Sequence, residues 1–356
     1  MDFEALASAG WKNWFAQAFA GFDQQTHVAA RVVAVHRNGL SVYPELSGFD
    51  QLPLGGRWYQ EHPEARPTIG DWVVIERQTG AIAEFLERTS VIKRISPSTG
   101  EVQLIAANID TAFLVTSCNA DFSPGRLERY LAVVNEADIQ PVVVLTKTDQ
   151  TADVDDYLDQ VKQLSADLPV EAVNALDVDT LQGLRQWCVQ GQTIALLGSS
   201  GVGKSTLVNS LAGQQVQLTA GIREADGKGR HTTTHRSLHF LPGGGVILDS
   251  PGMREFQIAD ATSGVHQVFE DIETLTAQCR FADCQHDSEP DCAVQAALAD
   301  GRLDERRLQN YFKLQREEQY NSETIAQRHA RVRQFDKKVR ASMNEKKIAK
   351  NSVKKD

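Results

Sequence analysis

The sequence lacks an apolar run long enough to cross a membrane, and it also lacks the basic start of a secretory signal. Met1–Glu4 contains two acidic residues, and Lys12 and Gln17 interrupt the apolar stretch that follows. Cysteine is scarce: the five present are an odd number, and three of them lie close to a histidine. That pattern fits a metal site in a reducing compartment better than a disulfide framework. We therefore expect a soluble, cytoplasmic protein.

Strong compositional bias is absent as well. Hydrophobic residues make up 41% of the chain and charged residues 24%, which is enough apolar material for real cores and excludes a disordered protein. A length of 356 residues suits two or three domains. No internal repeat and no heptad seam occurs, so we expect a monomer.

The net charge of −10 at first argues against a nucleic-acid partner. The charge is unevenly distributed, however. Between Arg328 and Asp356 eleven lysines and arginines face three acidic residues, which gives this segment a net charge of +8. A basic tail on an acidic body is typical of an RNA-contacting arm, and it is equally typical of a solvated terminus. Both interpretations stay open.

Within the first hundred residues the sequence pattern changes once, from helical to strand-like. Residues 1–25 have the apolar spacing of a short amphipathic helix. Short β-like runs separated by turn signals then predict a small barrel, and the OB-fold is the most frequent barrel of that size. The predicted strands are Val28–Val35, Leu40–Tyr43, Trp72–Glu76 and Ala81–Leu86. Basic and aromatic residues among them suit stacking on RNA bases, but barrel cores need aromatic residues too.

Beyond a linker at Pro97–Gly100 the pattern becomes α/β, with apolar strands separated by segments of helical length. Helices are predicted at Arg126–Ala137 and Asp155–Ser165. The predicted strands are Thr111–Thr116, Val142–Thr146, Thr193–Leu197 and Val246–Leu248. After Pro251 the chain reads as helical, and the cysteine cluster lies there.

The strongest motif matches G-x-x-x-x-G-K-[ST] in full, between a predicted strand and a predicted helix. In such a loop, glycines let backbone N–H groups close around a phosphate, and the helix start adds positive potential. Lys204 is expected to bridge the β- and γ-phosphates, and Ser205 to ligate Mg²⁺. The predicted phosphate-binding residues are Gly198, Ser199, Ser200, Gly201, Val202, Gly203, Lys204, Ser205 and Thr206.

A second motif, Thr146-Lys147-Thr148-Asp149, follows an apolar strand and matches [NT]-K-x-D. The two oxygens of Asp149 can accept hydrogen bonds from guanine N1–H and from the 2-amino group, and adenine offers no such donor pair. A site built on paired hydrogen bonds rejects an analogue that lacks them. Lys147 is expected to lay its stem over the base. The motif therefore predicts guanine specificity.

Two further elements complete the expected nucleotide site. Asp249-Ser250-Pro251-Gly252 ends a strand and matches D-x-x-G, so Asp249 should hold Mg²⁺ through water and the Gly252 N–H should contact the γ-phosphate. The polar stretch Gly221–Arg236 contains several threonines, of which Thr233, and after it Thr232, is expected to ligate Mg²⁺. A merely flexible loop is the alternative for this stretch.

The order of the motifs is unusual. Most GTPases run from P-loop to D-x-x-G to the base-reading motif, whereas here the base-reading motif precedes the P-loop by about fifty residues. The second base-contacting loop, usually Ser-Ala, should then fall between them. Its best match is Asn174-Ala175, in which asparagine replaces the serine. The sequence thus predicts a circularly permuted GTPase.

Four ligand-type side chains lie within fourteen residues, at Cys279, Cys284, His286 and Cys292. Three thiolates and one imidazole match a closed, tetrahedral structural zinc site without an open catalytic position. Three clustered buried cysteines are the alternative. The other two cysteines, Cys118 and Cys188, fall near α/β elements and are predicted to be core residues rather than nucleophiles.

Together these motifs, in this order, resemble the ribosome small-subunit-dependent GTPase A family of bacterial circularly permuted GTPases, and the resemblance covers essentially the whole chain. It implies late maturation of the small ribosomal subunit, binding to its 16S rRNA, and GTPase activity that the subunit stimulates. The expected segments are an N-terminal helical extension (1–25), an OB-fold barrel (26–95), a permuted GTPase domain (96–258) and a zinc-binding helical domain with a basic tail (259–356).

The residue after D-x-x-G is often a glutamine that orients the attacking water, but here it is Met253, which cannot do so. We therefore expect slow intrinsic hydrolysis, with a partner or His231 positioning the water. Lys204 and Thr233 complete the expected catalytic set. Two other functions stay open: a nucleotide-gated RNA-binding module in which turnover is secondary, and a metabolic P-loop kinase, which Asp149 opposes.

Overall fold

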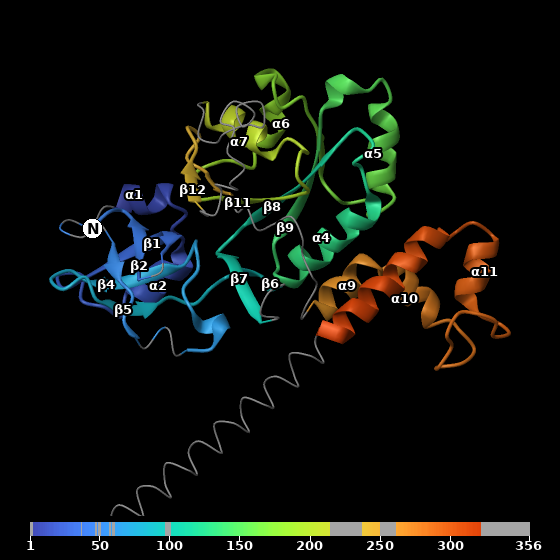
Figure 1. Cartoon of the computed structure of the whole chain (residues 1–356), viewed down its shortest axis with the longest axis horizontal. Coiled ribbons are helices and arrows are strands. Elements are labelled where there is room, and N and C mark those ends of the chain that lie inside the picture. The colour runs from blue at the N-terminus through green and yellow to red at the C-terminus, as the bar shows by residue number, and fades with distance from the viewer. Residues whose placement is uncertain are drawn as a thin grey trace, which may run out of the picture.

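The computed structural model describes residues 3–36, 38–46, 48, 51–56, 58, 61–96, 101–213, 237–249 and 261–321, without the side chains of Ser237 and Asp249. An N-terminal antiparallel sheet lies on one side of a larger α/β layer, and C-terminal helices lie against the other side, next to helix α4 (Figure 1). Among the described residues no helix combines the length and the apolarity that a membrane span requires.

The N-terminal segment forms two short helices, α1 (Phe3–Ser8) and α2 (Asn13–Phe19). The single amphipathic helix predicted for residues 1–25 is therefore wrong. The chain turns at Gly10, whose φ of +90° is open to glycine but strained for other residues. Both helices cover one face of the first sheet, where Phe15 packs on the fully buried Trp72.

The first sheet has five antiparallel strands in the order β3-β2-β1-β4-β5. Alternate residues point to opposite faces, as a strand requires: Trp72 and Val74 face the two helices, and Val73 and Ile75 face a second apolar cluster. Closure of a barrel needs β3 to pair with β5, and no such pairing occurs among the described residues. The OB-fold barrel therefore stays a prediction. The strands are β1 (His27–Val35), β2 (Gly39–Tyr43), β3 (Leu52–Pro53), β4 (Trp72–Glu76) and β5 (Ile82–Phe85).

A hairpin, β6 (Val91–Ile95) with β7 (Val102–Ala107), connects the two sheets and was not predicted. The buried Arg31 fixes the junction beside it, because its guanidinium donates to the Thr193 hydroxyl at 2.8 Å and to the Asn108 carbonyl at 3.0 Å. Burial lowers the pKa of Arg31 to about 10, so it remains charged at neutral pH.

The second sheet has six strands in the order β10-β9-β8-β11-β13-β12. The first five are mutually parallel and β12 is antiparallel to β13, so the sheet is mixed. The four predicted strands of this region are confirmed, and β10 and β12 were missed. The strands are β8 (Thr111–Ser117), β9 (Gln140–Thr146), β10 (Val170–Ala172), β11 (Thr193–Leu197), β12 (Ser237–Phe240) and β13 (Val246–Asp249).

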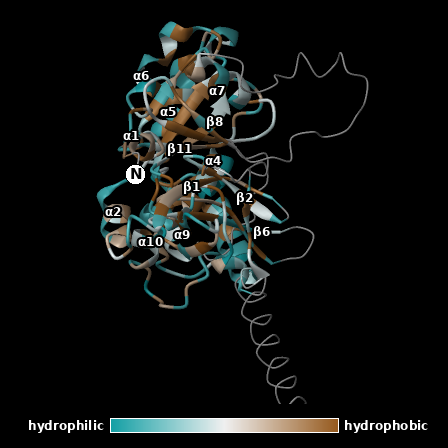
Figure 2. Ribbon diagram, turned by 90° about the vertical axis from the view of Figure 1, so that its left-hand side faces the viewer, coloured by the Kyte–Doolittle hydropathy of each residue, from teal (hydrophilic) through white to brown (hydrophobic). Residues whose placement is uncertain are grey.

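Helices cover both faces of this sheet, whose strands are largely apolar while the outer helix surfaces are polar (Figure 2). Helices α4 (Pro124–Glu136) and α5 (Val154–Lys162) cover one face. The short α6 (Gln182–Arg185) and α7 (Lys204–Ala212) cover the other. A parallel sheet buried on both faces explains why its strands read as continuous apolar runs.

The C-terminal part is helical, as predicted, and packs on α4. It contains α9 (Thr262–Val268), α10 (Glu270–Thr276) and α11 (Ala293–Ala299), and residues 305–321 form a further helix. Gly264 lies so close to α4 that an added Cβ would stand 1.9 Å from the Ala132 carbonyl oxygen. Only glycine permits this approach of the two helices.

Candidate functional site: a nucleotide site and a Cys3His cluster

The P-loop connects the buried strand β11 to helix α7, as the motif requires. Its first glycine, Gly198, passes so close to β8 that a Cβ there would lie 2.3 Å from the Val115 carbonyl oxygen. Gly201 and Gly203 have φ of +85° and +95°, which glycine adopts without strain. These glycines turn the chain sharply at the carboxyl edge of the sheet, where α/β proteins bind phosphorylated ligands.

Lys204 begins α7, and its ammonium group reaches back over the loop. Its Nζ donates to the Gly198 carbonyl at 2.7 Å and to the Ser199 carbonyl at 2.5 Å. A positive charge therefore lies at the mouth of the loop, beside the N-terminal N–H groups of α7. This combination of a lysine, glycines and a helix start is suited to binding a polyphosphate.

The base-reading motif lies directly beside the P-loop, although about fifty residues separate them in sequence. The buried Thr146 hydroxyl donates to the Val202 carbonyl at 2.5 Å, and it also lies 3.1 Å from the Thr116 carbonyl. Strand order explains the proximity, since β9 and β11 flank β8 and all three end at the same edge. One hydroxyl thus joins the end of β9 to the P-loop and lies beside the end of β8.

After Thr146 the chain turns abruptly. Lys147 has a φ of +58°, an uncommon conformation for a residue with a side chain, and Thr148–Gln150 form a short 3₁₀ turn. Asp149 is exposed in this turn. Backbone strain of this kind concentrates at functional sites, and here it directs the motif outward from the strand end.

The proposed Asn-Ala loop follows β10 at the same edge. The Asn174 side-chain oxygen accepts from the Leu176 N–H at 3.0 Å, so it caps its own turn. The Ala175 carbonyl accepts from the Ser210 hydroxyl of α7 at 2.6 Å. The structure therefore brings this loop next to the P-loop helix, and its contact with a base stays a prediction.

Four predicted site residues cannot be compared with the structure. His231, Thr233 and Gly252 lie outside the described residues, and so does the side chain of Asp249. The backbone of Asp249 ends β13, which pairs with β11 in parallel, so its strand end adjoins the P-loop strand.

The sequence analysis missed a polar cluster beneath the P-loop. Arg126 of α4 donates to the Ser199 hydroxyl at 2.9 Å, and that hydroxyl donates to Asp121 at 3.3 Å. Ser123 caps α4 through its hydroxyl, which accepts from the Arg126 N–H at 3.4 Å. The Ser-Pro pair was the available signal, because it marks a helix start directly after β8.

The Cys3His residues come together as predicted, with all ligand atoms within 4.8 Å of one another. The His286 Nδ1 lies 3.6 Å from the Cys279 sulfur and 3.5 Å from the Cys292 sulfur, and these two sulfurs are 3.9 Å apart. Tetrahedral zinc with ordinary bond lengths separates its ligands by about 3.8 Å for two sulfurs and about 3.6 Å for sulfur and nitrogen. The residues therefore fit a zinc ion.

Neighbouring groups hold Cys292, His286 and the chain on either side of His286 in place. The Gln295 backbone N–H donates to the Cys292 sulfur at 3.4 Å, and its side-chain amide donates to the His286 carbonyl at 2.6 Å. Glu289 accepts from the N–H groups of Gln285 and Asp287, and these backbone bonds lower its pKa to about 2. Such outer contacts are typical of structural metal sites.

The two remaining cysteines are core residues, as expected. Cys118 and Cys188 are buried, and burial raises their thiol pKa to about 11 and about 12. Both therefore stay protonated at neutral pH, which excludes a nucleophilic role for them in this conformation.

Known families match this chain over its central and C-terminal parts. The family model described as RsgA GTPase matches residues 85–259, which contain both nucleotide motifs. A second model, described as ABC transporter, matches residues 181–354. That range includes the P-loop and Asp249–Gly252 but not the base-reading motif Thr146–Asp149, so of the two models only the RsgA GTPase model covers the base-reading motif.

Curated relatives match nearly the full length. A protein of Vibrio vulnificus named small ribosomal subunit biogenesis GTPase RsgA 2 is 48% identical over 96% of this chain and 96% of its own length. A Mesorhizobium japonicum protein named small ribosomal subunit biogenesis GTPase RsgA is 44% identical over 89% of this chain and 91% of its own.

Two solved structures share the fold. YjeQ from Thermotoga maritima matches with a TM-score of 0.58 at 23% identity, over 81% of this chain and 97% of its own. YloQ, described as a circularly permuted GTPase, matches with a TM-score of 0.54 at 25% identity, over 85% of this chain and 96% of its own. The expectation of a permuted P-loop GTPase is thereby confirmed, and the chain belongs to the RsgA family of GTPases.

Proposed function

We propose that this protein binds the small ribosomal subunit through its 16S rRNA and hydrolyses GTP to GDP and phosphate when the subunit stimulates it, as a late maturation checkpoint. The observation that carries the proposal is the hydrogen bond from Thr146 to Val202, which joins a guanine-reading motif to a P-loop. The printed names of the relatives supply the biological setting.

Several described residues of the nucleotide site have a defined role in this proposal. Asp149 accepts from guanine N1–H and the 2-amino group, and Lys147 covers the base. Lys204 moves from the loop carbonyls to the β- and γ-phosphates, while backbone N–H groups of Gly201–Lys204 bind the β-phosphate. Ser205 and Thr206 lie on the first turn of α7, where Ser205 would hold Mg²⁺; when bound, this ion neutralises charge on the phosphates.

The hydrolytic residues of the proposal come from the motif pattern. Thr233 and Asp249 would complete the Mg²⁺ shell, Asp249 through water, and the Gly252 N–H would contact the γ-phosphate. His231 would position the attacking water, because Met253 offers no suitable polar group. A partner that orders this region raises the rate of other GTPases by orders of magnitude, and the ribosomal subunit would take that part here.

The flanking segments complete the proposed architecture, with boundaries at 1–25, 26–95, 96–258 and 259–356. The N-terminal sheet would close into an OB-fold barrel that contacts RNA, and zinc at Cys279, Cys284, His286 and Cys292 would stabilise the C-terminal module. A protein that acts on ribosomal subunits would be located in the cytoplasm. We also propose that this protein acts as a monomer.

A second candidate function is a nucleotide-gated RNA-binding module in which turnover is secondary. Met253, in place of the usual glutamine, favours it. The two candidates differ in one measurable quantity, which is the rate of phosphate release when subunits are present.

The test is phosphate release from GTP by the full-length protein with small subunits, with large subunits and with neither, and with ATP as control. The checkpoint GTPase requires slow intrinsic turnover, strong stimulation by small subunits and no use of ATP. Binding to subunits without any stimulation would overturn it in favour of the second candidate.

A further inference from the structure

A groove of about 700 Å³ lies between the start of α4 and the helix of residues 305–321. Ser123 and Gly125 line the α4 side, and Arg306, Phe312, Lys313 and Arg316 line the other. It is distinct from the Cys3His cluster and from the carboxyl edge of the sheet where the nucleotide motifs meet. Three cations and no carboxylate are among the residues that line it.

The three cations form a stripe along one helix face, since positions seven and ten residues apart recur on the same side of an α-helix. Arg306 and Lys313 are separated by about 10 Å along the axis, and Arg316 lies about 4.5 Å further. All three side chains are exposed. Neither Lys313 nor Arg316 takes part in an ion pair with any part of the chain that the structure describes.

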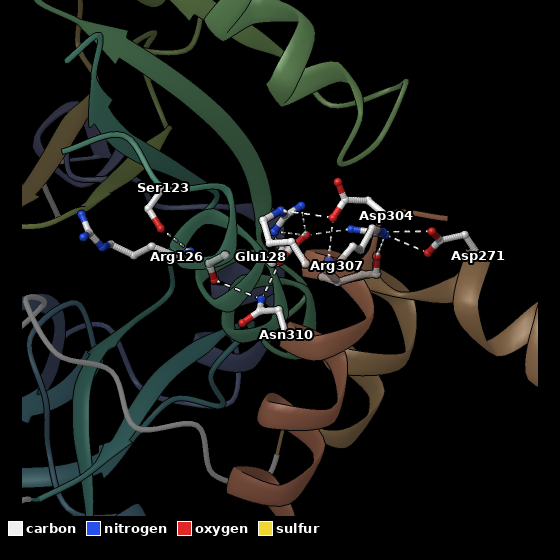
Figure 3. Close-up of polar contacts among 10 residues, drawn as sticks. Ser123, Arg126, Glu128, Asp271, Asp304, Arg307 and Asn310 are labelled. Atoms are coloured by element: carbon white, nitrogen blue, oxygen red, sulfur yellow. Dashed lines mark hydrogen bonds and ion pairs between the residues drawn. The ribbon is translucent and has the colours of Figure 1, made fainter. Parts of the chain in front are cut away.

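A buried polar network fixes the floor of the groove. Glu128 of α4 is completely buried and accepts from Arg307 at 3.0 Å and from Asn310 at 2.5 Å (Figure 3). Arg307 also binds Asp271 of α10 at 2.9 Å. The two walls are therefore held at a fixed spacing, as a preformed binding groove requires.

Arg306 of the stripe also pairs with Glu128, with its Nη1 3.2 Å from Oε2, and its Nε lies 3.8 Å from Asp304 Oδ1. Lys313 and Arg316 are therefore the stripe cations that have no carboxylate partner among the described residues.

The groove adjoins the Cys3His cluster on one side and lies near the P-loop on the other. Phe312, in its wall, stacks on His286 at a centroid distance of 6.2 Å and an interplanar angle of 20°. Ser123, in the opposite wall, caps the helix turn from which Arg126 reaches the P-loop residue Ser199. A ligand in this groove would touch both the C-terminal module and the helix that adjoins the nucleotide site.

We propose that this groove binds the phosphate backbone of RNA, with Lys313 and Arg316 as its principal phosphate contacts and Arg306 as the third. This proposal rests on the function proposed above and names a contact surface for it. An open groove with cations spread along about 15 Å fits a chain of phosphates rather than one small anion. The net charge of the whole chain is −10, so the positive stripe is a local concentration of cations and does not reflect the overall charge. Eleven further lysines and arginines follow in residues 328–356, which extends the basic sequence beyond the helix.

The test compares two charge-matched double variants of the full-length zinc-loaded protein. K313Q/R316Q removes the two unpaired groove cations, and K162Q/R302Q removes two exposed cations elsewhere. Binding to an RNA hairpin is measured over a range of salt concentrations. The slope of log affinity against log salt should fall by about 1.5 to 2 in the groove variant, with weaker binding to every RNA sequence, and should stay unchanged in the control. Zinc content and Tm show that both variants are folded.

A second readout needs no substitution. Acetylation of surface lysines on the wild-type protein, followed by mass spectrometry, should show that RNA protects Lys313 and does not protect Lys162. Equal affinity and salt slope in the two variants, or no protection of Lys313, would overturn the proposal. Competition by millimolar inorganic phosphate would point to a small-anion site instead, and equal competition by poly-glutamate would point to an acidic protein partner; either result also overturns it.

The RNA hairpin separates this proposal from the function proposed above. If the groove variant loses RNA binding but small subunits do not stimulate the wild type, the groove proposal stands and the checkpoint function fails. If K313Q/R316Q binds RNA as the wild type does and is still stimulated by small subunits, the groove proposal fails and the checkpoint function stands.

Discussion

The Thr146 hydroxyl donates a hydrogen bond of 2.5 Å to the Val202 carbonyl oxygen, and this bond crosses from the base-reading motif to the P-loop. Thr146 is fully buried at the end of β9, and Val202 is fully buried in the loop before α7. The two halves of the nucleotide site are therefore connected through the protein itself. The bond holds the end of β9 against the P-loop, so we infer that the base contacts and the phosphate contacts depend on the same buried hydroxyl.

Replacing Thr146 with valine should weaken nucleotide binding and stability together. T146V keeps the side-chain shape but removes the donor, so the carbonyl of the buried Val202 loses its partner at a cost of about 1–3 kcal/mol. We expect GTP and GDP affinity to fall about tenfold and Tm to fall by several degrees. Calorimetry measures both. The control is T262V, which removes an exposed hydroxyl bonded to Glu318; equal effects in the two variants would contradict the account.

Replacing Asp149 with asparagine should change base preference rather than abolish binding. Guanine presents two donors to the carboxylate, whereas xanthine carries an oxygen at the 2-position. The amide of D149N can accept from N1–H and donate to that oxygen. We expect GTP affinity to fall about a hundredfold or more and xanthosine triphosphate affinity to rise. Competition against a fluorescent nucleotide measures this; a variant that loses both nucleotides equally would show that Asp149 does not read the base.

Much of the α/β layer was predictable, because its strands are buried on both faces and leave continuous apolar runs. The predicted bounds Thr193–Leu197 match β11 of this layer, and in the N-terminal sheet those of Trp72–Glu76 match β4. Motif spacing likewise predicted the Cys3His cluster, since four ligands within fourteen residues leave few alternatives. In each case the signal is local in sequence.

What the sequence could not indicate depends on distant partners. Glu128 has the pattern of a solvated helix residue, yet it is fully buried because Arg307 and Asn310 reach it from about 180 residues away. The N-terminal helix was predicted as one piece because its apolar spacing is continuous through Gly10. Tertiary contacts override that spacing: the Ala9 carbonyl accepts from the buried Arg31, and the chain turns there.

Removing the Glu128 carboxylate should destabilise the packing of the C-terminal module on α4. E128A leaves the buried Arg307 with only its Asp271 and Val268 partners. Loss of one partner from a buried ion pair costs about 3 kcal/mol, or roughly 6 to 12 °C in Tm for a unit of 150–250 residues. Thermal unfolding followed by circular dichroism checks this. E305A, which removes an exposed carboxylate on the helix that carries Arg307, should change Tm little; a similar loss in both would contradict the role of Glu128.

The five cysteines should divide into two reactivity classes. At pH 8 the pKa values of about 11 for Cys118 and about 12 for Cys188 lie above the solution pH, so about a thousandth or less of each thiol is the reactive thiolate. Iodoacetamide should therefore spare both in the folded protein. Chelation of zinc should make Cys279, Cys284 and Cys292 reactive, and denaturant should expose all five. Mass spectrometry counts the labels; alkylation of Cys118 as fast as Cys279 would contradict this division.

The most direct test of the central claim is the subunit-stimulated release of phosphate, measured for wild type and D149N with GTP and with xanthosine triphosphate. If one site both reads the base through Asp149 and hydrolyses under control of the small subunit, stimulation will follow GTP in the wild type and xanthosine triphosphate in D149N. The pairing also excludes a contaminating nucleotidase, because such an enzyme would not follow the substitution. Stimulation with the same nucleotide preference in both proteins, or none in either, would contradict the account.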